Sequence, residues 1–227
     1  LTDENKTLFK TYFKEQKPVI LRQLDDVMKL PAFRKWTQEQ LYNDYGNVSF
    51  SVYTRTKTTP HRSFKMTMGE YLDYMNNLND DDDFPIWLVD TKIDEKAKPL
   101  YSEDTKKFEF YDYMLKQASN GQHGFNNYQF MVGPAKTGVS PHFHNSALNL
   151  LVHGEKLWFL FPPAASFFST KHVHEWFRED LHILNENGIY PSMCRQQPGD
   201  LLWAPNLWGH GVIYTKNSIG IAYLYQG

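Results

Sequence analysis

The chain has 227 residues, of which 41% are hydrophobic and 16% aromatic, and its formal net charge at pH 7 is −2. This length and composition favour one large domain with a packed core, and the charge excludes the broadly basic surface of a typical nucleic-acid-binding protein. No apolar run is long enough to span a bilayer, and the single cysteine, Cys194, excludes an internal disulfide and a four-cysteine zinc site.

Residues 1–83 predict a mixture of helices and short strands. Apolar residues at helical spacing indicate helices, two capping boxes indicate helix starts, and alternating apolar residues indicate strands. In chain order we expect a helix over 2–16, a strand over 19–21, a helix from the capping box at Thr37 to Gly46, a strand over 47–56 and a helix from the capping box at Thr67 to about Leu78. The acidic run at residues 80–83 is predicted to be a solvated loop.

Residues 84–227 have a predominantly β pattern. Short apolar runs between glycine and proline turns predict strands over 86–89, 128–133, 148–152, 157–161, 201–204 and 218–225. The sequence His153-Gly154-Glu155-Lys156 has the character of a hairpin turn between two of them, and residues 169–187 predict a helical insertion. Many short strands late in the chain indicate a mainly β fold, either a barrel or a jelly roll.

Three histidines form the candidate metal site. His142 and His144 lie two residues apart at the entrance to a predicted strand, where alternate side chains point to the same face. His210 follows the predicted strand over 201–204, and we expect a neighbouring strand to bring it to the same place. Three ligands on one side of a metal leave positions open for substrate or dioxygen, as in non-haem iron sites.

A histidine is more often a surface residue or a hydrogen-bonded core residue than a metal ligand. That interpretation is kept for the remaining histidines: His61, His123, His153, His172, His174 and His182. His172 and His174 repeat the H-x-H spacing, but they border a predicted helix and no downstream residue completes a site.

Short motifs spread over the chain share one resemblance. They are residues 133–138, His142-Phe143-His144, residues 149–158, Phe161-Pro162-Pro163, Pro198-Gly199-Asp200, Pro205, Trp208 and His210. Together they resemble the Jumonji C (JmjC) family, and the likeness extends from residue 17 to the last predicted strand. The resemblance implies a double-stranded β-helix of the cupin or jelly-roll type with helical N-terminal decoration. It further implies a single JmjC domain over residues 1–227, with a mixed α/β part over 1–83 and the metal-carrying β-helix core over 84–227.

Most members of this family are oxygenases that depend on Fe(II) and 2-oxoglutarate. Their metal is held by an H-x-D/E motif and a distal histidine, which correspond to His142 and His210 here. The carboxylate position corresponds to His144, so this chain departs from the common pattern, as one subgroup of the family does. Three neutral imidazoles shift the metal preference toward zinc, nickel or copper, although other divalent transition metals remain open.

The implied cosubstrate site is partly retained. The family lysine that pairs with the far carboxylate of 2-oxoglutarate corresponds to Lys156, and a family amide near the metal corresponds to Asn149. Without the resemblance, Lys156 would be taken as an exposed hairpin lysine. Two hydroxyl-bearing positions of the family are Val139 and Ala222 here, which weakens the expectation of tight 2-oxoglutarate binding.

Two functions therefore compete. The leading hypothesis is a JmjC-type Fe(II)- and 2-oxoglutarate-dependent oxygenase, a protein hydroxylase with a three-histidine site; the alternative is a catalytically weak or inactive metal-binding scaffold that acts through protein–protein interaction. A hydrolase using a metal-bound water fits three histidines, but no acidic residue lies within the H-x-H motif or beside His210 to act as a base. We expect a protein substrate or partner, no nucleic acid and no membrane insertion; the sequence does not predict an oligomeric state.

The resemblance also implies a location, the lumen of the endoplasmic reticulum. Two glycosylation sequons, at Asn5 and Asn47, agree with it. The first four residues do not resemble a signal peptide, so any address signal is expected to lie outside this sequence.

Overall fold

The computed structural model describes residues 2–54, 62–79, 85–90, 95–105 and 125–225, so the acidic run at 80–83, His61 and His123 lie outside the described residues. The helices are α1 (Asp3–Lys14), α2 (Asp25–Met28), α3 (Ala32–Lys35), α4 (Gln38–Tyr45), α5 (Met68–Asn76), α6 (Pro99–Ser102), α8 (Val173–Glu179) and α9 (Leu181–Glu186). The strands are β1 (Val19–Leu21), β2 (Ser49–Thr54), β3 (Arg62–Thr67), β4 (Trp87–Asp90), β5 (Phe125–Gly133), β6 (Gly138–His142), β7 (Ala147–Phe161), β8 (Ser192–Gln196), β9 (Leu201–Ala204) and β10 (Gly209–Tyr225).

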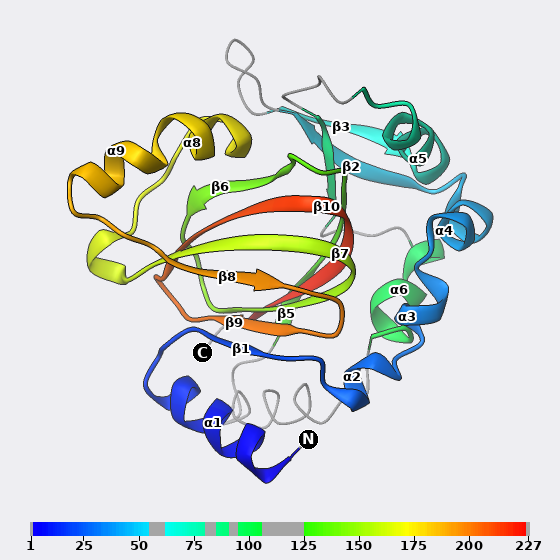
Figure 1. The fold of residues 1–227 in the computed structure, drawn as a ribbon. Helices are drawn as coiled ribbons and strands as arrows, with labels where there is room; N and C mark the ends of the chain where they lie inside the picture. Colours follow the sequence, from blue (N-terminus) through cyan, green and yellow to red (C-terminus); the bar gives the residue numbers. More distant parts are fainter. Residues whose placement is uncertain (1, 55–61, 80–84, 91–94, 106–124, 226–227) are drawn as a thin grey trace.

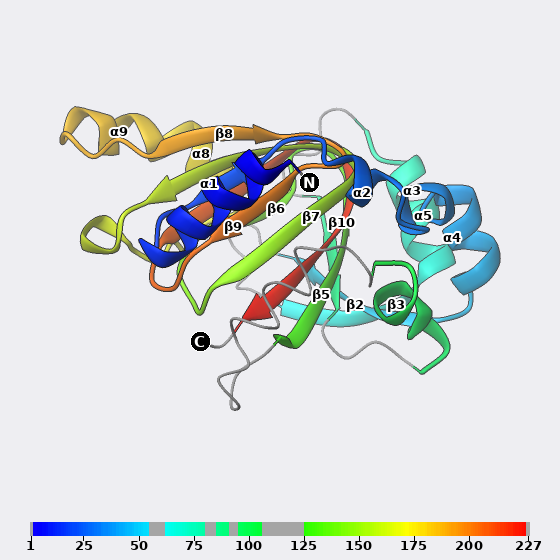
Figure 2. The ribbon, with the colours of Figure 1, turned by 90° about the horizontal axis from the view of Figure 1, so that it is seen from below.

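The ten strands form one antiparallel sheet in the order β1-β9-β7-β10-β5-β4-β2-β3, with β6 added to β10 and β8 added to β7. The two long strands β7 and β10 lie at its centre (Figure 1), and the sheet is strongly curved (Figure 2). The predicted mainly β, jelly-roll fold with N-terminal helices and a helical insertion is confirmed. Strand β1 pairs with β9, and β2 with β4, so residues on both sides of position 83 contribute to one sheet; the single-domain organisation itself stays a prediction.

The predicted hairpin at residues 153–156 is wrong, because β7 continues through it as one bent strand. Gly154 takes a left-handed φ of +92°, and a Cβ atom there would lie 2.2 Å from the carbonyl oxygen of Asn217. Opposite it, the register of β10 against β7 shifts between Tyr214 and Gly220. The first half of β7 pairs with β9 and the second half with β8, so the two apolar runs are halves of one strand that changes partners.

The N-terminal helices form as the sequence predicts. The hydroxyl of Thr2 accepts the amide N–H of Asn5 at the start of α1, and Thr67 and Glu70 complete a reciprocal capping box for α5. Thr37 caps α4, which ends at Gly46. Strand β3 was not predicted, because most of its side chains are exposed and it has no buried apolar face. The short helices α2, α3 and α6 were not predicted, because helices of four residues carry too little periodicity to detect.

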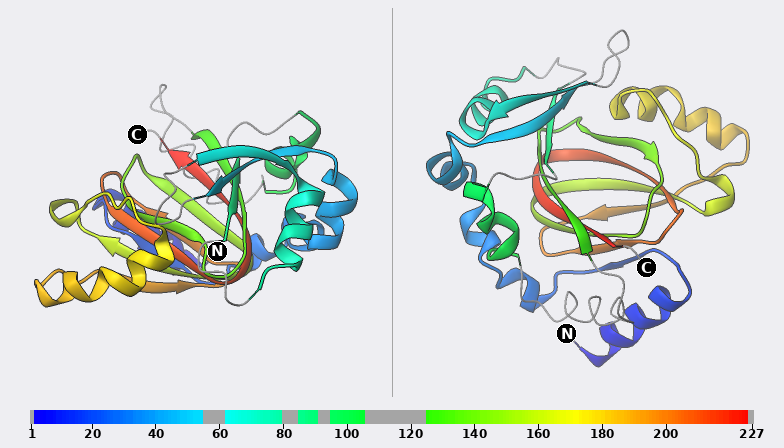
Figure 3. Two further views of the ribbon diagram at one scale, coloured as in Figure 1. Left: turned by 90° about the horizontal axis from the view of Figure 1, so that it is seen from above. Right: turned by 180° about the vertical axis from the view of Figure 1, so that it is seen from behind.

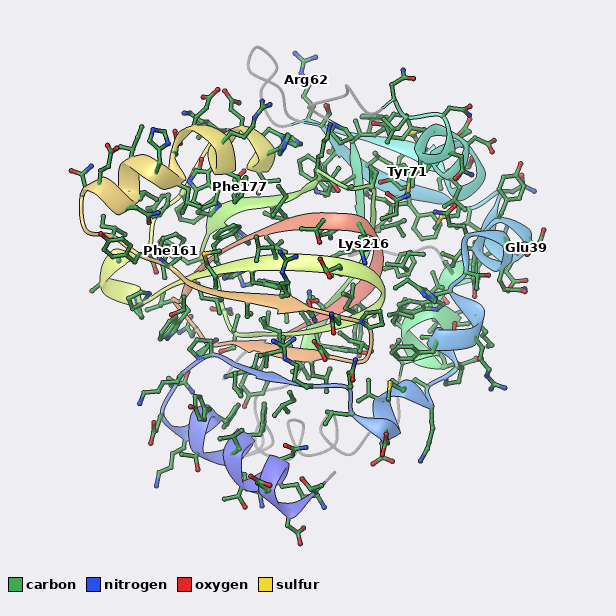
Figure 4. All side chains as sticks on the ribbon, in the orientation of Figure 1. Glu39, Arg62, Tyr71, Phe161, Phe177 and Lys216 are labelled. Carbon is green, nitrogen blue, oxygen red and sulfur yellow. The ribbon has the colours of Figure 1, made fainter. Side chains whose placement is uncertain are left out.

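The helices lie in separate groups around the sheet. Helices α8 and α9 lie on one side and α4 and α5 on the other, as the views from the front and from behind agree (Figures 1 and 3). A satellite core of Phe159, Phe161, Trp176 and their neighbours joins α8 to the sheet, and the labelled Phe161 and Phe177 lie on that side (Figure 4). Within the described residues, no helix combines the length and apolar character needed to cross a membrane.

Candidate metal site

The three predicted histidines come from two strands and a loop. His142 is the last residue of β6 and pairs in register with His210 near the start of β10. His144 lies beyond the end of β6, so the expected strand alternation does not explain its position. The loop that precedes β10 holds it instead, because the amide N–H of Leu207 donates to the carbonyl of His144 at 3.2 Å.

The three imidazoles converge closely enough to bind one metal ion. One ring nitrogen from each residue can be chosen so that all three lie within 4.8 Å of one another. The Nε2 atoms of His144 and His210 are 3.2 Å apart, and the ring centroids of His142 and His210 are separated by 4.3 Å. Within the part of the chain that the structure describes, this is the one such group of three or more potential ligands.

Hydrogen bonds to the backbone set the tautomer of each ring. The Nδ1 atom of His142 lies 2.9 Å from the carbonyl oxygen of Ser140, and that of His210 lies 2.9 Å from the carbonyl oxygen of Trp208. His144 makes the same contact with Asn145. A carbonyl accepts only an N–H, so each Nδ1 carries the proton and each Nε2 presents a lone pair. A cation would offset the repulsion between two lone pairs 3.2 Å apart. Metal-binding histidines typically donate their other ring N–H to a carbonyl in this way.

Burial keeps two of the ligands neutral. It lowers the pKa of His144, opposed by the hydrogen bond with Asn145. Burial is also the main reason that the pKa of His210 lies well below its usual value of 6.5, and the neighbouring rings of His142 and His144 lower it further. Neutral imidazoles are the form that binds metals, so protons compete weakly for these two nitrogens.

The same cavity contains a buried amine. Lys156 and Asn149 line it together with the three histidines, and Lys156 is only 1% exposed. Its Nζ lies 3.5 Å from Oδ1 of Asn149 and 4.8 Å from the centre of the Tyr214 ring. Burial lowers the pKa of Lys156 from 10.5 to about 7, and among the described residues no carboxylate forms an ion pair with it to offset that burial. An anionic ligand would provide the missing charge.

Most of the remaining wall is apolar. Val139 and Ala222, where the resembling family carries hydroxyl groups, both line the cavity, so neither hydroxyl is available to a ligand. Among the lining residues that sequence reasoning missed, Gln129 and Trp158 have side chains that can form hydrogen bonds. Trp158 follows Lys156 by two positions in β7, so strand alternation could have found it; Gln129 is the register partner of Ala222 in β5, which only the sheet topology reveals.

The other H-x-H pair has a structural role. The ring of His172 is 1% exposed, and its Nδ1 accepts the amide N–H of His174 at the start of α8. His172 also packs edge-to-face against Trp87, with ring centroids 6.0 Å apart. Among the described residues, these two histidines are not part of the group of potential metal ligands formed by His142, His144 and His210.

The cupin-like domain family matches residues 5–227. The chain therefore belongs to this family, as a cupin-like JmjC domain. It is 30% identical over 227 residues to the bifunctional arginine demethylase and lysyl-hydroxylase of Caenorhabditis elegans, covering 92% of this chain and 55% of that protein. It is 28% identical over 233 residues to an arginine-specific demethylase of Arabidopsis thaliana, covering 96% of this chain and 43% of that protein.

A third relative is named for its JmjC domain. The chain is 25% identical over 227 residues to JmjC domain-containing protein 8 of Mus musculus, covering 94% of this chain and 76% of that protein. This identity is lower than that to the nematode protein, of which the chain spans about half the length. The family resemblance predicted from the motifs is thereby confirmed.

Proposed function

We propose that this chain is a metal- and 2-oxoglutarate-dependent oxygenase that hydroxylates a side chain of a protein substrate. The observation that carries the proposal is one cavity with three Nε2 lone pairs and a buried Lys156 amine. A 2-oxo dicarboxylate matches both features, since its oxo-acid end chelates a metal and its far carboxylate pairs with a lysine. The relatives named as hydroxylases and demethylases support the same class of chemistry.

The chain's own residues would bind the metal and the cosubstrate and hold them in the right orientation. His142, His144 and His210 would hold Fe(II) or another divalent transition metal, which when bound activates dioxygen. Lys156 and Asn149 would fix the far end of the cosubstrate. The apolar wall, including Met131, Leu202 and Val212, would exclude water from the reacting groups.

A catalytically weak or inactive metal-binding scaffold is the second candidate. Three observations favour it: an imidazole stands at the carboxylate position, His144, and apolar side chains stand at Val139 and Ala222 on the cavity wall. Such a protein would act through protein–protein contacts and keep the metal for stability.

The two candidates differ in the fate of 2-oxoglutarate. The protein is loaded anaerobically with Fe(II), supplied with 2-oxoglutarate and then exposed to dioxygen while succinate is measured. An oxygenase binds 2-oxoglutarate only when metal is present and releases succinate, slowly without its protein substrate. Absence of both metal-dependent binding and succinate would favour the scaffold.

Replacing His144 with aspartate tests whether the site works best with three histidines or with the carboxylate of the common family pattern. We expect His144→Asp to bind Fe(II) more tightly than wild type, by roughly tenfold or ~1.4 kcal/mol, because a carboxylate oxygen offsets metal charge that three neutral nitrogens leave uncompensated. Affinity is measured by anaerobic chelator competition.

His144→Asn is the matched control, because it has the shape of aspartate without its charge, and it should bind more weakly than wild type. A different result would establish a working three-histidine oxygenase: robust succinate production by wild type that His144→Asp abolishes.

A location in the lumen of the endoplasmic reticulum, implied by the sequence resemblance, is part of the proposal. Asn47 is exposed in the turn between α4 and β2, whereas Asn5 lies inside α1, so Asn47 is the better glycan acceptor. We expect the complete protein made in animal cells to lose mass on glycosidase digestion, and Asn47→Gln to remove most of that loss. No change in mass for the wild type would contradict lumenal residence.

A further inference from the structure

Gln196 lies directly behind the cavity wall. It ends β8, is 0% exposed and is not one of the residues that line the cavity. Its Oε1 accepts the indole N–H of Trp158 at 2.9 Å. Its Nε2 donates to the carbonyl oxygens of Asn149 at 3.0 Å and of Asp200 at 3.2 Å. Two of these three partners, Asn149 and Trp158, line the cavity.

Gln196 lies where β7 changes partners. On this side, β7 pairs with β9 up to Leu150 and with β8 from Lys156 onward. At this junction the side-chain amide of Gln196 donates to two backbone carbonyls, that of Asn149 in β7 and that of Asp200 just before β9. Both hydrogens of its amide group are used and its oxygen is used. A carboxyl group of the same shape can donate only one hydrogen, and only when protonated.

The two partners of Gln196 belong to different parts of the site. Asn149 presents its Oδ1 to the Lys156 ammonium at 3.5 Å. Trp158 packs beside a metal ligand, with its ring centroid 6.1 Å from that of His210. The buried side chain of Gln196 therefore hydrogen-bonds both to Asn149, which contacts Lys156, and to Trp158, which packs beside His210.

We propose that Gln196 is a positioning residue that sets the anion-binding end of the cavity relative to its metal-binding end. The identity of the anion, 2-oxoglutarate, rests on the function proposed above. The geometric claim does not, since it concerns how Asn149 and Trp158 are held. Loss of the amide would let both side chains shift, although neither is itself replaced.

The test uses Co(II)-loaded protein, with 2-oxoglutarate as the probe anion. Gln196→Met keeps the volume and removes all three hydrogen bonds, while Gln196→Glu keeps the acceptor for Trp158 and at most one donor. We expect 2-oxoglutarate affinity, measured by calorimetry, to fall about tenfold or more in Gln196→Met, because Asn149 and Trp158 both lose a buried hydrogen bond that holds them in place. Gln196→Glu should be intermediate, and the Co(II) absorption spectrum should change in Gln196→Met because Trp158 no longer supports His210.

A control separates positioning from general stability. Leu41→Ala removes a fully buried side chain from α4 and should destabilise the fold without changing the affinity or the spectrum. Wild-type affinity and spectrum in Gln196→Met would overturn the proposal, as would equal losses in Leu41→Ala. Should Gln196→Met fail to fold, Gln196→Glu carries the same comparison. If wild type holds Co(II) but binds no 2-oxoglutarate, the proposed function fails, and the Co(II) spectra of the variants alone then decide the role of Gln196.

Discussion

His210→Ala is expected to abolish stoichiometric binding of a divalent transition metal. His210 is buried, and its Nε2 lies 3.2 Å from that of His144. Its ring centroid lies 4.3 Å from that of His142, closer than the 5.1 Å between His142 and His144. Its removal leaves two ligands on one side of the ion. Affinity should fall by at least about 100-fold, because losing only a hydrogen-bonding neighbour of a ligand already costs about 10- to 100-fold. Elemental analysis after dialysis, followed by calorimetric titration with Co(II), measures the loss.

His142→Ala should behave in the same way, because the site is one cluster and neither strand supplies a substitute. His182→Ala is the matched control: it removes an exposed histidine of α9 and should leave one metal per chain. Unchanged metal content in both His142→Ala and His210→Ala would show that the ion lies elsewhere.

Lys156→Met is expected to change ligand binding and fold stability in opposite directions. It should weaken 2-oxoglutarate binding by roughly tenfold or more, because a charge-assisted contact contributes ~1.5–3 kcal/mol. It should also raise the free energy of unfolding of the ligand-free protein, by on the order of 1–4 kcal/mol, since an apolar side chain replaces a buried amine without a carboxylate partner. Calorimetry with 2-oxoglutarate and chemical denaturation measure the two effects.

The pH dependence provides an independent signature of the same residue. Burial lowers the pKa of Lys156 from 10.5 to about 7, so the unfolded chain holds one more proton than the folded chain between those two values. Stability of the wild type therefore rises with pH across that window, and this rise should be absent in Lys156→Met. Affinity of the wild type for 2-oxoglutarate should fall as the pH rises above about 7, because the amine loses the proton that attracts the carboxylate.

Lys216→Met is the matched control for both measurements. Lys216 is an exposed lysine on the opposite strand of the same bend (Figure 4). It should alter neither 2-oxoglutarate affinity nor the pH dependence of stability. Equal 2-oxoglutarate affinity in wild type and Lys156→Met would show that Lys156 does not bind the ligand.

Local chemistry explains which elements could be predicted from sequence. Capping boxes and apolar spacing located α1, α4 and α5, because the signals lie within a few neighbouring residues. Alternation located β2, where Phe50 and Val52 are fully buried. The bend at Gly154 could not be predicted, since a glycine between two apolar runs suits a hairpin as well as a bent strand. The choice depends on strands β8 and β9, which lie some 40 residues away in sequence.

The site, too, has features that the local sequence reveals and features that depend on distant parts of the chain. The three histidines could be named from their spacing and from family resemblance, yet the loop contact that holds His144 comes from Leu207, far along the chain. Its local pattern alone would make Lys156 an exposed hairpin lysine, whereas the family resemblance assigns it to the cosubstrate site; in the structure it is part of the continuous strand β7 and lines the cavity. Gln196 carries no local signal, because its role depends on the indole of Trp158 and on a change of strand partners.

The register match between His142 and His210 also has a consequence for folding. Among the described strands, β6 pairs with β10 alone, so only one ladder of hydrogen bonds keeps it in place. An ion held by His142 and His210 would cross-link the two strands at the end of that ladder, and through His144 it would fasten the following loop as well. Metal binding and the pairing of β6 with β10 would then be thermodynamically coupled, so that each stabilises the other.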